Sequence, residues 1–210
     1  MKLYGSIYVI IYILLIAVIF VLPFFSFDVY SITKNSISEL GAQKAPGNLV
    51  LNSTILFMSL VIILLGFKVL KAYALQLITL CTFSFSFFLT GVFKMAGPYN
   101  KSFNYNYTQD ALHSLFSTIT GFSFCLFCAF LLIILTKKKH KTQTIAMLIL
   151  AIGFSYFMFK IPDLKGIFQR LLFMSAFAWL FFALVNYEKN IPFRKHNMEI
   201  KTFNDYKNKF

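Results

Sequence analysis

Six segments of the chain contain no Asp, Glu, Lys or Arg, and this segregation of charge constrains the fold more than any other feature. The 20 basic and 7 acidic residues all lie between or beyond these segments. Each segment is close to the length that an α-helix needs to cross about 30 Å of hydrocarbon, the last two when they include flanking residues. We predict six spanning helices, at residues 5–27, 49–67, 72–93, 111–136, 142–159 and 171–187.

The composition supports a membrane protein and excludes several other classes. The 210 residues are 59% hydrophobic, 19% aromatic and only 13% charged, with a mean hydropathy of +0.73. Such a chain is too apolar for a soluble enzyme, a disulfide-framed secreted domain or a stand-alone nucleic-acid binder. We predict an all-α polytopic membrane protein, with a six-helix bundle over residues 1–187 and a basic cytoplasmic tail over residues 188–210.

The net charge of +13 follows membrane topology, since basic residues alternate in density between successive connections. Thirteen of the 20 Lys and Arg residues lie on the side of the two termini, and seven lie on the opposite side. The positive-inside rule therefore predicts that both termini are cytoplasmic. On this reading the KKKHK run of residues 137–141 anchors the topology beside anionic lipid, and no nucleic-acid partner is expected.

The first long outer connection, residues 28–48, contains the signals of a short helix. Ser36 and Glu39 have the spacing of a capping box, and Gly41 suits a left-handed residue that ends a helix. Asn48 is the predicted N-cap of the second span. Two interpretations of Glu39 therefore stay open: it is a capping carboxylate, or it faces a ligand or partner.

The second outer connection, residues 94–110, is rich in Tyr and Asn, which is typical of an aromatic belt at headgroup level. At its end Thr108 is the predicted cap of the fourth span, and Asp110 favours the positive end of that helix. His113 is the single histidine within the predicted spans. An intramembrane histidine indicates function, but one in the first turn can also be hydrogen-bonded to Asp110 at the interface.

Polar residues within two spans fall on single helical faces, which predicts contact between those spans. Simple packing and a polar cleft that descends from the outer surface both fit this pattern. The faces are Thr79, Thr82, Ser86 and Thr90 in the third span, and His113, Ser117 and Thr120 beside Gly121 in the fourth.

The cysteines do not form a recognisable site. Cys125 and Cys128 make a CxxC pair deep in the fourth span, where apolar burial disfavours the thiolate that redox chemistry needs. They are read as packing residues, as is Cys81. A catalytic zinc site needs several converging ligands, and His113 is isolated from other histidines. We therefore predict no metal and no cofactor.

Arg170, at the start of the sixth span, must snorkel, pair with a carboxylate or bind a lipid phosphate. Since Glu39 and His113 also lie at outer ends, we predict that these three side chains converge into one charged site. There Glu39 accepts hydrogen bonds from both His113 and Arg170. Arg170, assisted by Gln169 and Lys94, then holds a lipid phosphate or another anion.

Several motifs together resemble a known family. They are the stretch SISELGAQ followed by APG and Asn52, Gly91 at the end of the third span, His113, and GIFQRLLF followed by Trp179. This pattern is similar to the bacterial six-helix membrane family catalogued as domain of unknown function 998. The resemblance implies an integral protein of the bacterial inner membrane without a settled activity, and it transfers no catalytic residue. It also implies that the outer residues belong together: Ser36, Glu39, Gly41, His113, Gln169 and Arg170.

The residues leave three functional classes open. The first is a non-enzymatic membrane protein whose outer polar pocket, with Arg170, Gln169, Lys94, Glu39 and His113, binds a lipid headgroup, a small anion or a membrane or envelope protein. The second is a membrane-embedded hydrolase or transferase that acts on lipid or envelope precursors. There His113 is the acid/base, and Ser36 or Glu39 is the nucleophile or orienting group. A small transporter is the third class, disfavoured because no charged residue lies deep in the spans.

Overall fold

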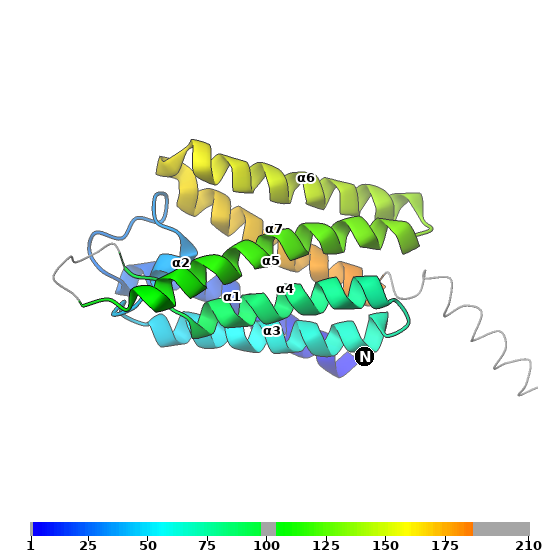
Figure 1. Ribbon diagram of the computed structural model, residues 1–210, viewed down its shortest axis with the longest axis horizontal. Helices are drawn as coiled ribbons and strands as arrows, with labels where there is room; N and C mark the ends of the chain where they lie inside the picture. The colour runs from blue at the N-terminus through cyan, green and yellow to red at the C-terminus, as the bar shows by residue number, and fades with distance from the viewer. Residues whose placement is uncertain (1, 98–103, 187–210) are drawn as a thin grey trace, which may run out of the picture.

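The computed structural model describes residues 2–97 and 104–186, and in these residues it contains helices and no strand (Figure 1). Six helices are long and apolar enough to cross a membrane, so the chain is an all-α, multi-pass membrane protein, as predicted. The long helices are α1 (Lys2–Val21), α3 (Asn48–Leu70), α4 (Ala74–Val92), α5 (Tyr107–Ile134), α6 (Lys138–Lys160) and α7 (Lys165–Asn186).

Three short helical segments lie in the connections, namely η1 (Leu22–Phe25), α2 (Ile37–Leu40) and η2 (Pro162–Leu164). All three lie at one end of the bundle, which we call the loop end (Figure 1). The opposite end, called the tail end, carries the start of α1, the end of α7 and two tight connections at residues 71–73 and 135–137. The charge bias predicts that the tail end is cytoplasmic. The predicted tail at residues 188–210 falls outside the described residues.

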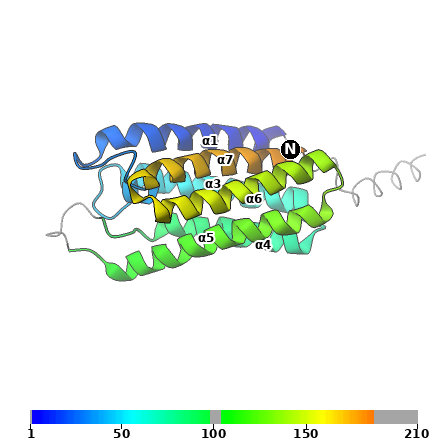
Figure 2. The same ribbon diagram turned by 90° about the horizontal axis from the view of Figure 1, so that it is seen from above.

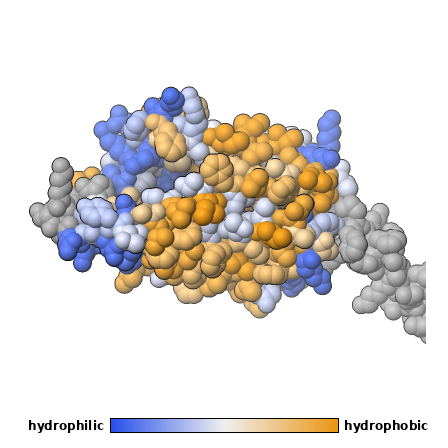
Figure 3. Space-filling view, in the orientation of Figure 1, coloured by the Kyte–Doolittle hydropathy of each residue, from blue (hydrophilic) through white to orange (hydrophobic). Residues whose placement is uncertain are grey.

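The helices pack as antiparallel neighbours along the chain. The pairs α3 and α4, α4 and α5, and α6 and α7 form hairpins, while α1 packs against α3 and α7 (Figure 2). Aromatic rings from α4, α5 and α7 meet between the hairpins, with Phe87 5.2 Å from Phe177 and Phe83 5.4 Å from Phe124 between ring centroids. In the view of Figure 3 hydrophobic residues dominate the middle of the bundle, and hydrophilic residues gather at both ends.

Helix boundaries differ from the predicted spans where local chemistry overrides the charge pattern. The first helix ends at Val21, since Pro23 lies in the 3-10 turn of η1. The fourth span begins at Tyr107 because the side chain of Asn106, rather than Thr108, accepts a hydrogen bond from the backbone of Gln109 at 3.1 Å. The basic run at 137–141 is mostly helical, since α6 begins at Lys138.

Two predicted helix signals in the 28–48 connection were wrong. Gly41 has φ −89° and is not left-handed. Glycine is required there because a Cβ would overlap the side-chain amide of Asn52, which donates to the Gly41 carbonyl at 3.0 Å. The N-cap of α3 is Gly47 with φ 71°, whereas the Asn48 side chain donates to the carbonyl of Ala42.

The predicted contact between the third and fourth spans is confirmed in part. The Thr120 hydroxyl donates to the Ser86 hydroxyl at 2.9 Å, so these polar positions of α4 and α5 do meet. Ser117, Thr82 and Gly121, however, are exposed, and a Cβ at Gly121 would meet nothing within 4 Å. Gly121 therefore does not bring the helices together.

Close helix approach occurs instead at Gly91, where α4 meets α3. A Cβ at Gly91 would lie 3.1 Å from the carbonyl oxygen of Asn52 and 3.2 Å from side-chain atoms of Ile55 and Leu56. Since two of these contacts are branched side chains and one is backbone, the neighbours have little room to move. Gly91 thus sets the spacing of α3 and α4 at the loop end.

This geometry predicts opposite outcomes for one substitution at two glycines. Gly91→Leu should lower the free energy of unfolding in detergent by about 2 kcal/mol or more, because the added side chain separates α3 from α4. Gly121→Leu is the matched control and should change it by less than about 0.5 kcal/mol, since that face is open. Thermal unfolding of both variants measures the difference. Equal destabilisation of the two would contradict the assignment.

Candidate functional site

The capping box predicted at α2 forms, and it also binds a cation from α7. The Glu39 atom Oε1 accepts hydrogen bonds from the backbone N–H of Ser36 at 3.2 Å and from its hydroxyl at 3.1 Å. The Lys165 ammonium donates to the same oxygen at 2.7 Å, and the Asn35 side chain donates to Oε2. Glu39 is 3% exposed, so this carboxylate is a buried connector between the 28–48 connection and α7.

The surroundings of Glu39 favour its charged form. Burial by itself raises the pKa of this carboxyl. Hydrogen bonds from Lys165, Asn35 and Ser36, together with the charge of Lys165, outweigh that effect and hold the pKa of Glu39 below its ordinary value. Glu39 is thus an ionised acceptor, and a nucleophilic role would require it to leave these donors.

Arg170 is 2% exposed and is surrounded by oxygen acceptors. Its donors reach five oxygens at 2.7 to 3.2 Å, and in the described part of the chain none of these belongs to a carboxylate. The acceptors are the carbonyl oxygens of Ile19, Ile32, Asn35 and Gly166 and the hydroxyl of Tyr30. The guanidinium therefore joins α1, the 28–48 connection and α7 in one buried network.

The GIFQR stretch on α7 is the surface on which this connection rests. The Gly166 amide donates to the Thr33 carbonyl at 2.8 Å, and a Cβ at Gly166 would overlap the carbonyl oxygens that lie against it. One helical turn later, the side-chain oxygen of Gln169 accepts from the backbone N–H of Ile37. Gly166, Gln169 and Arg170 share one face of α7 and hold the connection with backbone contacts. We call this arrangement, with Tyr30, Asn35, Glu39 and Lys165, the loop clamp.

His113 lies in a different cluster, where α5 meets the end of α4. Its Nδ1 is 2.9 Å from the carbonyl oxygen of Phe93 and 3.1 Å from that of Thr90. Because carbonyls only accept, Nδ1 carries the proton in this arrangement. Asp110 accepts from the backbone of Ala96 at 2.8 Å and not from His113. His113 thus closes the loop end of the α4–α5 hairpin.

Gln43 connects these two parts of the loop end. Its side-chain amide donates to the carbonyls of Lys94 and Asn106, both at 2.9 Å, and its side-chain oxygen accepts from the Asn106 amide at 2.8 Å. Its backbone N–H donates to Met95. Lys94 is therefore positioned by the α4–α5 side of the loop end and makes no described hydrogen bond to Arg170.

The predicted pairing of Glu39 with both His113 and Arg170 is wrong in its contacts. Glu39 and Arg170 do share the loop clamp, but they are linked through Asn35 and not by a direct bond, and Glu39 pairs with Lys165. Across residues 2–97 and 104–186 no hydrogen bond joins His113 to Ser36, Glu39 or Arg170. Sequence reasoning missed Lys165, Tyr30 and Asn35, because nothing in a connection's sequence specifies which helix it folds against.

The described residues also contain no group of three His, Cys, Asp or Glu side chains placed to hold a metal ion. Cys81, Cys125 and Cys128 are free thiols within α4 and α5.

The clamp predicts a large effect for the most conservative substitution of Arg170. Arg170→Lys keeps the charge but cannot reach four carbonyls and a hydroxyl at once, so buried acceptors lose their donors. We expect the free energy of unfolding to fall by about 3 kcal/mol or more. Lys34→Gln removes an exposed pair with Asp163 and is the control, with an expected loss below about 1 kcal/mol. If Arg170→Lys lowers the free energy of unfolding by no more than this control does, the Arg170 network does not stabilise the fold.

The lowered pKa of Glu39 predicts a pH-dependent contribution to stability. A carboxyl whose pKa is lower in the folded state stabilises the fold above its unfolded value, near 4.5, and loses that effect as the pH falls through the folded value. The wild type should therefore exceed Glu39→Gln in unfolding free energy near neutral pH, by about 1 kcal/mol. This difference should shrink as thermal unfolding is measured at increasingly acidic pH. A difference that stays constant with pH would contradict the charged, clamped carboxylate.

Comparison with known proteins identifies a family but no characterised relative. The family model described as Protein of unknown function (DUF998) matches residues 10–186, which include most of the first span, the other five spans and the loop clamp. No curated protein and no solved structure matches the chain. Since the match extends from within α1 to the end of α7, the chain belongs to the DUF998 family of proteins of unknown function.

Proposed function

We propose that the chain is a non-catalytic membrane protein whose loop end binds a phosphate-bearing anion at a surface built around Lys165. The supporting observation is that Lys165 is held by the buried carboxylate of Glu39 while its side chain stays 38% exposed. A lysine ammonium has three donors, so one ion pair leaves two for a ligand. Lys34, whose side chain is 64% exposed, pairs with Asp163 two residues before Lys165, so it adds an ammonium there but no net charge.

The predicted ligand-binding residues take indirect roles in this proposal. Arg170, Gln169 and Glu39 fix the backbone and Lys165 from beneath, and their own polar groups are engaged in the clamp. Arg170 adds a buried positive charge that no carboxylate contacts directly within the described residues, which favours an anion above it. Lys94 and His113 border the neighbouring α4–α5 cluster and are not assigned a contact with the ligand.

The hydrolase or transferase alternative lacks the contact on which it depends. A nucleophile at Ser36 or Glu39 needs His113 within hydrogen-bond reach, at about 2.6 to 3.2 Å. Instead, the Ser36 hydroxyl donates to Glu39, and His113 uses Nδ1 to hold the end of α4. We therefore favour binding, in the bacterial inner membrane with the loop end outside, as the resemblance and the charge bias predict.

The proposal predicts ligand-dependent stabilisation that requires Lys165. Purified protein in neutral detergent is titrated with glycerol 3-phosphate and with short-chain phosphatidylglycerol, and thermal unfolding is followed. A phosphate ligand that binds the folded state should raise Tm with concentration in the wild type, and Lys165→Gln should lose at least half of the shift. If only phosphatidylglycerol raises Tm, the ligand is a lipid headgroup. If both compounds raise Tm equally, the surface recognises the phosphate group alone.

Lys160→Gln is the matched control, since Lys160 is an exposed cation at the same end that contacts the Tyr156 ring. It should keep the full shift. The proposal fails if the wild type is not stabilised by either ligand, or if Lys165→Gln responds as the wild type does.

A further inference from the structure

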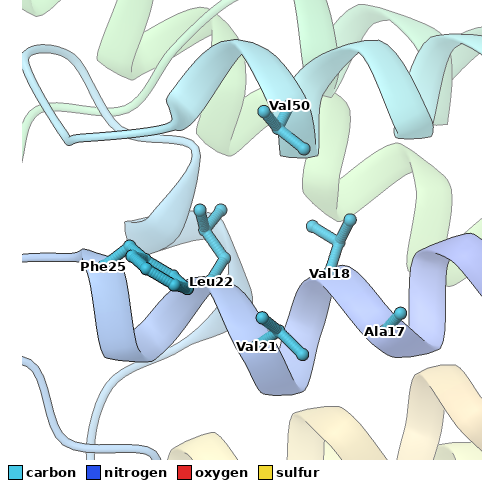
Figure 4. Close-up of a pocket in the computed structure, with 6 residues that line it drawn as sticks. All are labelled: Ala17, Val18, Val21, Leu22, Phe25 and Val50. Atoms are coloured by element: carbon cyan, nitrogen blue, oxygen red, sulfur yellow. The ribbon is translucent and has the colours of Figure 1, made fainter.

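The surface of the spans that faces the hydrocarbon gives no basis for preferring one lipid over another. A hollow beside α1, η1 and the first turn of α3 has a purely apolar lining (Figure 4), which consists of Ala17, Val18, Val21, Leu22, Phe25 and Val50. Lipid tails are as apolar as this lining, so contact with them does not discriminate between lipids. Selective binding of a lipid therefore requires charged groups at the ends of the bundle.

The tail end carries exposed lysines from two connections that are far apart in the sequence. Two of these lysines lie at the end of α3 and directly after it, and four lie at the start of α6. Figure 3 shows hydrophilic residues at this end of the molecule, next to its hydrophobic middle. We call this set of exposed residues the lysine face, and it consists of Lys68, Lys71, Lys137, Lys138, Lys139 and Lys141.

Contacts between helices bring the two groups of lysines to one surface. The buried side chain of Gln76, in the first turn of α4, donates to the carbonyl of Phe130 near the end of α5 at 2.7 Å. This bond holds the α3–α4 connection beside the α5–α6 connection, and both views of the fold place the two connections at the same end (Figure 1 and Figure 2). The Lys68 ammonium also lies 5.1 Å from the centre of the Tyr4 ring of α1. The lysine face is therefore a product of tertiary packing.

The lysine face has no counter-charge within residues 2–97 and 104–186. The four acidic residues that these ranges contain all lie at the loop end, where both described ion pairs also form; they are Asp28, Glu39, Asp110 and Asp163. Residues 188–210 contain six basic and three acidic residues, so they add further net positive charge to the chain. Because like charges repel, anions from another molecule complement this surface.

The lysine face begins where the apolar surface of the spans ends. The exposed apolar residues Ile133 and Ile145 lie four residues before Lys137 and four residues after Lys141. On α3, the exposed ring of Phe67 directly precedes Lys68. Lysines at such a boundary extend their ammonium groups to headgroup level while their methylene stems stay against the hydrocarbon. This position favours phospholipid headgroups as the anions, because their phosphates lie at the same level.

We infer that the lysine face binds the headgroups of anionic phospholipids in the leaflet at the tail end. Clusters of about four to eight basic residues next to a span are typical of surfaces that bind anionic lipid. The charge bias that predicts the orientation counts residues along the chain, whereas this surface depends on two connections that packing joins. The lysine face is independent of the proposed anion surface at Lys165, which lies at the opposite end of the bundle.

The experiment uses the full-length protein in vesicles that contain equal amounts of phosphatidylglycerol and phosphatidylethanolamine. The protein is extracted in mild detergent, and native mass spectrometry measures the ratio of the two lipids that stay bound. We expect the wild type to retain phosphatidylglycerol over phosphatidylethanolamine by about threefold or more. Lys68→Gln with Lys71→Gln, and Lys138→Gln with Lys139→Gln, should each lower that ratio by about half or more, because each pair removes charge from the same surface.

Two matched controls separate the lysine face from net charge and from side-chain identity. Lys44→Gln with Lys160→Gln removes two exposed lysines at the loop end and should keep the wild-type ratio. Lys138→Arg with Lys139→Arg keeps the charge at the tail end and should also keep the ratio. Thermal unfolding verifies that each variant is folded. The two tail-end pairs lie in different connections, so one pair still tests the inference if the other unfolds.

A wild type that retains the two lipids equally overturns the inference. A folded tail-end pair that keeps the wild-type ratio overturns it as well. An equal loss in the loop-end control would assign the preference to net charge alone and would also overturn the lysine face as a binding surface.

Discussion

The buried guanidinium of Arg170 is the interaction on which the loop end depends. A charged side chain at this depth is costly unless its donors are satisfied, and Arg170 satisfies them with four backbone carbonyls and the Tyr30 hydroxyl. The carbonyls benefit as well, because a connection without regular structure has few internal donors. One residue of α7 thereby fixes α1 and the 28–48 connection, and Gly166 is small enough to let the connection approach.

The polar residues at the loop end have structural roles in this network. Glu39, His113 and Gln169 have the residue types of a catalytic or ligand-binding site, yet each uses its polar atoms to hold backbone or a neighbouring helix. The loop clamp holds the Lys165 ammonium in place through Glu39 and leaves part of that side chain exposed. It also places Gly47 directly against Leu22 of η1, where an added Cβ would overlap a methyl group. The proposed anion surface at Lys165 therefore relies on the folded 28–48 connection.

Some contacts were accessible from the sequence, and others were not. Ser36 and Glu39 were recognisable as a capping box because both partners lie within one turn of helix. The partner of Glu39 outside that turn, Lys165, lies 126 residues away and was not recognisable. Gly121 shows the same limit, since its position beside a polar helical face suggested packing, whereas a Cβ at Gly121 would meet nothing within 4 Å. Periodicity defines a face but not the element that covers it.

The sequence alone determined that the chain crosses a membrane six times, because hydrocarbon excludes charged side chains and the charges are therefore confined to the connections. It also determined the short helix α2 (Ile37–Leu40) that Ser36 and Glu39 cap, since capping is local. Only the tertiary structure decided that Arg170 binds carbonyls, that Glu39 binds Lys165 and that Gly91 sets the spacing of α3 and α4. These contacts depend on which distant segments meet in the folded chain. A buried polar group must be hydrogen-bonded, but more than one partner can meet that requirement, so the sequence does not specify which partner it has.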